Sequence, residues 1–300
     1  MSAKIIAVIQ ARMTSSRLPG KVMLDIAGKP MLQHMLDRVR RANSLDDVIV
    51  ATTTDPTDDI LEQFCQEQGI PYYRGSLQDV LDRFYQAANK FRADVIVRLT
   101  ADCPLIDPAV LDRTVATFLG NIDFQAPLPD PIFPDASDSF HPTPGAFDFA
   151  ANRLPPPWNR TLPIGLDVEV CSFESLQRAW KEADQSFQRE HVLPYLYEDV
   201  SLSRSNPPLD PGWYVQTGRT PRGFRVALLN HFPDYGAMRW TVDTLADLEF
   251  VRQVYARLAG HPNFTWVDIL SLLEKEPELT YINASVQHKS AFDVDQQTGY

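Results

Sequence analysis

Apolar residues along the first 120 positions follow two different spacings. Continuous apolar runs predict buried strands, and apolar residues three or four positions apart predict amphipathic helices. The strands are predicted at residues 4–9, 47–53, 70–74 and 94–100. The helices between and after them are predicted at residues 31–43, 57–68, 77–92 and 107–119. Strands that alternate with helices in this way predict the α/β class, with a mainly parallel sheet flanked by helices.

The pattern changes after Gly120. Residues 126–163 are rich in proline and lack a clear period, which predicts a long loop. A second segment rich in Pro and Gly lies at residues 204–223. Further strands are predicted at residues 164–170, 224–231 and 238–243, and further helices at residues 172–184, 189–199, 245–259 and 265–277. We expect a single domain over residues 1–283, with a Pro-rich insertion at about 126–160 and a polar tail at 284–300.

Net charge excludes some classes of partner. The chain has 28 basic and 39 acidic residues and a formal net charge of −11, which argues against binding nucleic acid or an anionic membrane. A local group of cations can still bind a small anion in an acidic protein. No apolar run is long enough to span a membrane, and the N-terminus has no signal-peptide pattern. The three widely spaced cysteines are typical of reduced thiols, so we expect a cytoplasmic protein.

The first candidate site is the stretch "IIAVIQARMTSSRLPGKVM" at the start of the chain. A buried strand is followed directly by a turn with Ser, Thr and Gly, which offers hydroxyl and backbone N–H donors. Arg12, Arg17 and Lys21 add positive charge, so the stretch predicts a polyphosphate site. It has neither the P-loop spacing nor the GxGxxG fingerprint. The alternative is a solvated loop whose arginines pair with carboxylates.

Two aspartates are candidate ligands of a divalent cation. Asp102 follows one predicted strand and Asp243 ends another, so each carboxylate is expected at the sheet edge where ligands bind. Mg²⁺ prefers a few carboxylates together with phosphate oxygens. Alternatively, Asp102 braces the turn before Pro104 and Asp243 caps the following helix. The sequence does not show whether the two aspartates lie close together.

Two further segments carry polar residues. Asp167 and Glu169 lie on one face of the predicted strand in "GLDVEV", which indicates either the wall of a polar pocket or a solvent-exposed face. Arg189, Glu190 and His191 open the predicted helix in "REHVLPYLY". His191 is by default a structural histidine.

Six motifs resemble one known family when taken in order. They are "IIAVIQARMTSSRLPGKVMLDIAGKPML", "RGSLQDVLDRFYQAA", "RLTADCPLIDP", "GLDVEV", "REHVLPYLY" and "RWTVDTLADLEF". The chain resembles the spore coat polysaccharide biosynthesis protein F family, which is similar to the cytidylyltransferases that activate 3-deoxy-manno-octulosonic acid and the acylneuraminates. The resemblance implies a nucleotidyltransferase fold of the glycosyltransferase-A type. It also implies transfer of a cytidylyl group from CTP to a sugar acid with release of pyrophosphate, and it suggests a homodimer.

The resemblance also implies roles for single residues. The nucleotide-binding residues would be Gln10, Ala11, Arg12, Ser15, Ser16, Arg17, Lys21 and Arg98. The Mg²⁺ ligands would be Asp102 and Asp243, and the catalytic residues Lys21, Arg12 and Asp102. The acceptor-binding residues would be Asp167, Glu169, Arg189, Glu190, His191 and Arg239.

The chain departs from the family at the Pro-rich insertion, which lies beside the expected acceptor. The insertion leaves the acceptor sugar and catalytic competence open, and the sequence does not by itself select CTP over another nucleotide. Two alternative functions follow. One is a glycosyltransferase that uses a nucleotide sugar on the same scaffold, since one fold hosts many chemistries. The other is a non-catalytic nucleotide-binding or assembly protein that uses the insertion as its interaction surface.

Overall fold

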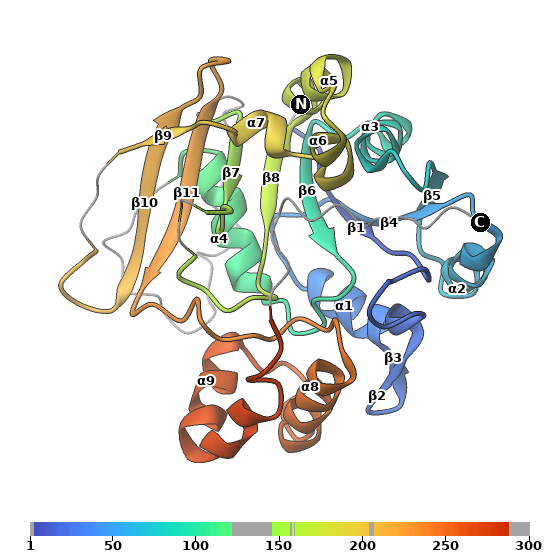
Figure 1. The fold of residues 1–300 in the computed structure, drawn as a ribbon, viewed down its shortest axis with the longest axis vertical. Helices are drawn as coiled ribbons and strands as arrows, with labels where there is room; N and C mark the ends of the chain where they lie inside the picture. Colours follow the sequence, from blue (N-terminus) through green and yellow to red (C-terminus); the bar gives the residue numbers. More distant parts are fainter. Residues whose placement is uncertain (1–2, 122–145, 157, 159, 204–206, 288–300) are drawn as a thin grey trace.

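A computed structural model of the protein describes residues 3–121, 146–156, 158, 160–203 and 207–287. Within these residues the chain builds a nine-stranded sheet in the order β5-β4-β1-β6-β8-β7-β11-β10-β9. Helices cover both faces of the sheet, and α8 and α9 lie beyond one end of its strands (Figure 1). The predicted α/β class, with a mostly parallel sheet flanked by helices, is confirmed.

One half of the sheet is parallel. It contains β5 (Tyr72–Gly75), β4 (Asp47–Thr53), β1 (Ile5–Gln10) and β6 (Val95–Thr100). Gln10, the last residue of β1, is in register with Ala51 on one side and with Thr100, the last residue of β6, on the other. The loops that follow β1 and β6 therefore leave the sheet at the same edge.

The other half of the sheet is mixed. β8 (Glu169–Ser172) runs antiparallel to both β6 and β7 (Phe149–Ala151), and β11 (Arg225–Phe232) runs parallel to β7. β10 (Gly212–Arg219) and β9 (Ser201–Leu202) complete this half as antiparallel neighbours, and β2 (Asp25–Ile26) and β3 (Lys29–Pro30) form a separate small sheet.

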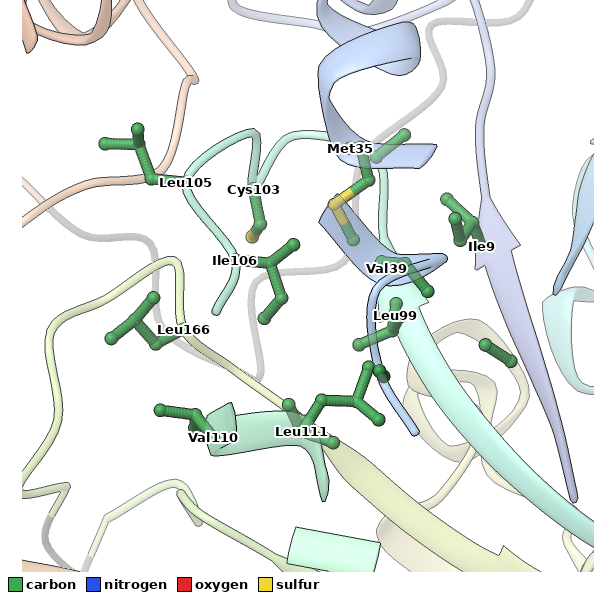
Figure 2. Packing of buried hydrophobic residues seen from close by; sticks show 14 of the residues in the cluster. Ile9, Met35, Val39, Leu99, Cys103, Leu105, Ile106, Val110, Leu111 and Leu166 are labelled. Atoms are coloured by element: carbon green, nitrogen blue, oxygen red, sulfur yellow. The ribbon is translucent and has the colours of Figure 1, made fainter. Parts of the chain in front are cut away.

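Two hydrophobic cores lie on opposite faces of the sheet. Alternate side chains of a strand point to opposite faces, so Ile9 of β1 contributes to one core and Val8 to the other. The first core packs against α1 (Met31–Val39), α2 (Asp59–Glu67), α4 (Pro108–Phe118), α8 (Leu245–Arg257) and α9 (Trp266–Lys275). The second packs against α3 (Val80–Phe91), α5 (Phe173–Glu182) and α7 (Pro194–Tyr197). Figure 2 shows Ile9 and Leu99 of two neighbouring strands packed beside Met35 and Val39 in the first core.

Some predicted elements are wrong. The helix expected at 189–199 is two short helices, α6 (Ser186–His191) and α7, because Val192 has a φ of 74° and Pro194 cannot continue a helix. The strand expected at 164–170 begins only at residue 169. Gly165 has a φ of 110°, and a Cβ there would lie 2.7 Å from the Thr241 nitrogen. No strand forms at 238–243, where a single bridge joins Ile164 to Arg239.

Two strands lie where the sequence predicts irregular structure. β7 falls inside the expected Pro-rich insertion, and β10 falls inside the segment at 204–223. Each is a short or half-polar segment that becomes a strand by pairing with β11. Residues 126–145, 157 and 159 of the predicted insertion and 288–300 of the predicted tail lie outside the described residues. The domain boundaries stay a prediction.

Candidate active site

A cleft of about 1140 Å³ opens at the edge where β1 and β6 end. Its walls come from segments far apart in the chain: the loop after β1, the loop after β6, the segments around β8 and the turn before α8. Of the residues predicted from the sequence, it is lined by Gln10, Ala11, Arg12, Ser15, Ser16, Arg17, Lys21, Arg98, Asp102, Asp167, Glu169, Glu190, His191 and Asp243. The fold therefore brings the predicted nucleotide and metal residues and four of the six predicted acceptor residues to one cavity.

Lys21 lies between the two aspartates. It begins a short 3₁₀ turn after Gly20, whose φ of 71° lies in the left-handed region that glycine adopts without strain. The Lys21 Nζ donates hydrogen bonds to Asp102 Oδ2 at 2.8 Å and to Asp243 Oδ1 at 2.9 Å. A third bond, 2.8 Å long, goes to the carbonyl oxygen of Val242. Three oxygens thus surround one cation.

Lys21, Asp102 and Asp243 stabilise one another's charged forms. Burial alone would lower the pKa of Lys21, but the carboxylates of Asp102 and Asp243 raise it above 10.5. Burial alone would raise the pKa of Asp102, but Lys21 lowers it below 3.8. The pKa of Asp243 is also below 3.8, because Lys21 and Arg17 outweigh burial and the repulsion from Asp102. All three groups are therefore charged at neutral pH.

The side chain of Asp243 is held by a second set of groups. Arg239 Nη2 donates to Asp243 Oδ2 at 2.7 Å, and Arg239 Nε donates to Asp247 Oδ1 at 2.8 Å. The Asp243 backbone N–H donates to Asp247 Oδ2, and Asn283 donates its side-chain N–H to Asp247 Oδ1. Thr244, and not Asp243, caps α8. The Asp243 carboxylate is therefore aimed at Lys21 rather than used to start the helix.

Two predicted acceptor residues do not line the cleft. Arg239 is 9% exposed, and its guanidinium is taken up by Asp243 and Asp247. Arg189 binds the carboxylate of Asp79 and donates to the carbonyl oxygen of Trp180 at 2.8 Å. The prediction that these two side chains face an acceptor is corrected, because both guanidinium groups bind other parts of the protein.

A buried carboxylate that sequence reasoning missed anchors the opening loop. Asp58 is fully buried, and its Oδ1 accepts a 2.7 Å hydrogen bond from the backbone N–H of Met13. Its other oxygen accepts from Thr53 at the end of β4. Asp58 therefore ties the loop to the neighbouring strand. The only signal in the sequence is the run of polar residues "TTTDPTDD", which begins at the end of a buried strand.

Arginines from three segments meet on one wall of the cleft. Burial, and then the nearby guanidinium of Arg12, lowers the pKa of Arg83 to about 10. The described contacts of the Arg83 side chain include no salt bridge, and its Nη1 donates to the Ser76 carbonyl. Arg98 binds Glu169 and donates to Gln10 Oε1 at 3.0 Å. Like charges held this close favour an anionic ligand. Arg83 lies inside the motif "RGSLQDVLDRFYQAA", yet its helical position gave no sign of a site.

Asp167 and Glu169 form an acidic wall of the cleft and do not lie on a solvent-exposed face. Glu169 is 4% exposed, and Asp167 accepts a 2.8 Å bond from Arg160 Nη1. Arg153 and Arg160 also line this wall and were missed, because both lie in the irregular Pro-rich stretch.

The residues around Lys21 fit a divalent cation. Two carboxylates and a carbonyl oxygen already hold an ammonium group there, which acts as a stand-in cation. Within the described residues no group of three or more His, Cys, Asp or Glu side chains could hold a metal ion by itself. A cation at this place would therefore need further oxygens, and phosphate and water are what Mg²⁺ usually takes.

Comparison with known proteins identifies the family. The model of a family described as cytidylyltransferase matches residues 6–258. The chain belongs to the cytidylyltransferase family. It is accordingly a nucleotidyltransferase. The chain is 30% identical to the spore coat polysaccharide biosynthesis protein SpsF of Bacillus subtilis over 91% of this chain and 95% of that protein.

Solved structures of cytidylyltransferases share the fold. A cytidylyltransferase from Leptospira borgpetersenii is 28% identical, covers 95% of this chain and 100% of its own, and superposes with a TM-score of 0.74. A CMP:2-keto-3-deoxy-manno-octonic acid synthetase complexed with CTP is 21% identical, covers 85% of this chain and 99% of its own, and has a TM-score of 0.55. The second likeness concerns the fold alone. The resemblance drawn from the six motifs is confirmed.

None of the helices in the described part of the chain combines the length and the apolar character that crossing a membrane requires.

Proposed function

We propose that this cytidylyltransferase transfers the cytidylyl group of CTP to a sugar acid and releases pyrophosphate. The observation that carries the proposal is the position of Lys21 between Asp102 and Asp243 in a cleft that Arg12 and Arg17 also line. A triphosphate needs several cations close together, and a metal that accompanies it needs carboxylates beside them. The cleft supplies both.

Different side chains of the cleft bind different parts of the substrates. Arg12, Arg17 and Lys21 bind the phosphates, and Ser15 and Ser16 add hydroxyl donors from the same loop. Lys21 leaves the two carboxylates to do so, and it stabilises the pyrophosphate as it departs. Gln10 and Ala11, at the end of β1, lie where the base or the ribose would sit. The acceptor hydroxyl attacks the α-phosphorus from the side of Asp167 and Glu169.

Asp102 and Asp243 are the residues that would hold Mg²⁺. When bound, Mg²⁺ would neutralise charge on the phosphate oxygens and lower the pKa of the attacking hydroxyl. The arginine and aspartate pair behind Asp243 keeps its carboxylate oriented toward the place that Lys21 now fills.

The products distinguish this reaction from the alternatives. A thermal-shift panel with the four nucleoside triphosphates and Mg²⁺ should give a selective rise in Tm with CTP. Incubation with CTP, Mg²⁺ and a panel of sugar acids should then release pyrophosphate. A glycosyltransferase would instead release a nucleoside diphosphate or monophosphate from a nucleotide sugar. A binding protein would shift with CTP and release nothing, and a flat panel would contradict the proposal.

A further inference from the structure

Arg153 has hydrogen-bond donors that face the cleft unused. Its side chain lines the cleft and is 22% exposed. Its guanidinium donates no hydrogen bond to any described residue, and its Nε is buried. Two carboxylates lie beside it, with 3.9 Å from Nε to Asp167 Oδ2 and 3.9 Å from Nη2 to Glu169 Oε1, which is too far for a hydrogen bond. A sheltered guanidinium that makes two long ion pairs but no hydrogen bond is costly, so its N–H donors can accommodate a further anion.

The position of Arg153 is set by the residue before it in the chain. The preceding residue, Asn152, is 1% exposed and joins the end of β7 to the segment before β8. Its Nδ2 donates to the carbonyl oxygen of Leu166 at 2.5 Å, and its Oδ1 accepts from the backbone N–H of Val168 at 2.9 Å. Asn152 therefore fixes Arg153 against the acidic wall.

The charges around Arg153 favour a monoanion. Two other arginines of the cleft bind the same two carboxylates, Arg98 to Glu169 and Arg160 to Asp167. Three guanidinium groups therefore share two carboxylates, which leaves one positive charge over. Glu169 and Asp167 raise the pKa of Arg153 against the lowering effect of burial, so it stays a cation at all working pH values. A dianionic phosphate would be repelled by these carboxylates more strongly than a single carboxylate group would.

We propose that Arg153 binds the carboxylate of the acceptor and so selects a sugar acid over a neutral sugar. The inference rests on the proposed function, because it assigns the acceptor half of the same cleft. Arg153 would donate two parallel N–H bonds to the carboxylate, a geometry that a guanidinium fork favours. The hydroxyls of the acceptor would then face Asp167 and Glu169, whose carboxylates accept hydrogen bonds.

The test compares Arg153→Met and Arg153→Lys with the wild type. The probes are 3-deoxy-manno-octulosonic acid, N-acetylneuraminic acid and the methyl ester of each. Loss of a charged hydrogen bond should raise the KM for the acid about 10- to 100-fold in Arg153→Met. The KM for CTP should stay within about twofold, because the phosphates bind at the other end of the cleft. The preference for acid over ester should fall by the same factor as the acid's affinity, and Arg153→Lys should restore part of it.

A second measurement does not require turnover. Phenylglyoxal modifies arginine side chains, and mass spectrometry locates the modified residue. A sugar acid should protect Arg153 of the wild-type protein, whereas its methyl ester should not. Arg178→Met removes an exposed arginine on α5 that pairs with Glu182, and it serves as the matched control with unchanged KM values.

The outcomes separate this inference from the proposed function. Unchanged acid KM and unchanged acid-over-ester preference in Arg153→Met would overturn the role of Arg153 while the proposed function stands. Failure of every acid to protect Arg153 in a protein that binds CTP would do the same. If the wild type binds no CTP, the proposed function fails, yet protection by an acid alone would still support the carboxylate site. If Arg153→Met does not fold, Arg153→Lys and the protection experiment decide.

Discussion

The ammonium of Lys21 donates a 2.9 Å hydrogen bond to the carboxylate of Asp243, across 222 positions of the chain. The lysine comes from the loop after the first strand, and the aspartate comes from the turn before α8. The ammonium of Lys21 therefore occupies the place between the carboxylates of Asp102 and Asp243 in the cleft. If the proposed function holds, a metal reaches the two carboxylates only when the ammonium leaves them for the phosphates, so nucleotide and metal binding should depend on each other.

Lys21→Met should increase the affinity for Mn²⁺ in the absence of nucleotide. The substitution removes the cation that competes for Asp102 and Asp243. Asp102 then has no salt bridge among the described residues, whereas Asp243 keeps those to Arg17 and Arg239. We expect the affinity to rise about tenfold or more, since an unpaired buried charge costs several kcal/mol. Titration of Mn²⁺ followed by electron paramagnetic resonance measures this directly.

Lys29→Met is the matched control for that experiment. Lys29 pairs with Asp37 on the surface, where its side chain is 55% exposed, so its loss should leave Mn²⁺ binding unchanged. Wild-type protein should gain Mn²⁺ affinity when CTP is added, and Lys21→Met should gain much less. Equal Mn²⁺ affinity of wild type and Lys21→Met without CTP would show that Lys21 does not compete with a metal.

Asp102→Asn should abolish turnover and keep the fold. Asparagine preserves the shape of the side chain but removes the charge that a metal ligand supplies, so kcat should fall by about 100-fold or more. The circular dichroism spectrum should not change, because the strand and turn around Asp102 rest on backbone bonds, such as that from the Val242 N–H to the Asp102 carbonyl. Near wild-type pyrophosphate release in this variant would exclude Asp102 as a metal ligand.

Asp247→Asn should destabilise the protein in a pH-dependent way. Burial alone would raise the pKa of Asp247, but Arg239 and the backbone N–H of Asp243 lower it below 3.8. The stability that this carboxylate contributes is therefore present above pH 3.8 and is lost as the pH falls through its folded-state pKa. We expect a loss of about 3 kcal/mol in the free energy of unfolding at pH 7. Urea titrations should show a smaller difference at pH 3.

Asp37→Asn provides the comparison for Asp247. Asp37 also has a lowered pKa, because the hydrogen bonds from Lys29 and Gln33 outweigh burial, but its side chain is 39% exposed. Its loss should cost about 0.5 kcal/mol or less at pH 7. A similar small loss in Asp247→Asn would mean that the network behind Asp243 contributes little to stability.

Asp58→Asn should weaken CTP binding indirectly, through the loop after β1 that Asp58 anchors. An amide keeps only one acceptor oxygen, so the bonds to Met13 and to Thr53 cannot both be made, and the opening loop loses its anchor. We expect the KM for CTP to rise about tenfold, as for the loss of one buried charged hydrogen bond. The KM for the acceptor should change little. Asp59→Asn, at the neighbouring exposed carboxylate that pairs with Arg74, should behave as wild type in the same assay.

Local pattern predicted the parallel half of the fold well. The runs at 4–9, 47–53 and 94–100 are continuous and apolar because these strands are buried on both faces, and each became a strand of the sheet. The pattern failed for β7 and β10, whose strand character comes from pairing with β11. It also failed at 238–243, where the apolar residues Trp240 and Val242 are buried but the backbone turns.

By itself the sequence determined the candidate residues for the chemistry: the cations of the loop after β1, the aspartate after the segment at 94–100 and the aspartate that ends the segment at 238–243. Their types and their places after buried segments are local properties, and the family resemblance rests on them. Only the tertiary structure decided their partners. It placed Lys21 between Asp102 and Asp243, turned Arg239 away from the cleft to support Asp243, and brought Arg153 to the acidic wall. The two contacts of Lys21 join positions 81 and 222 residues apart, and no local spacing records which distant backbone segments the sheet will bring together.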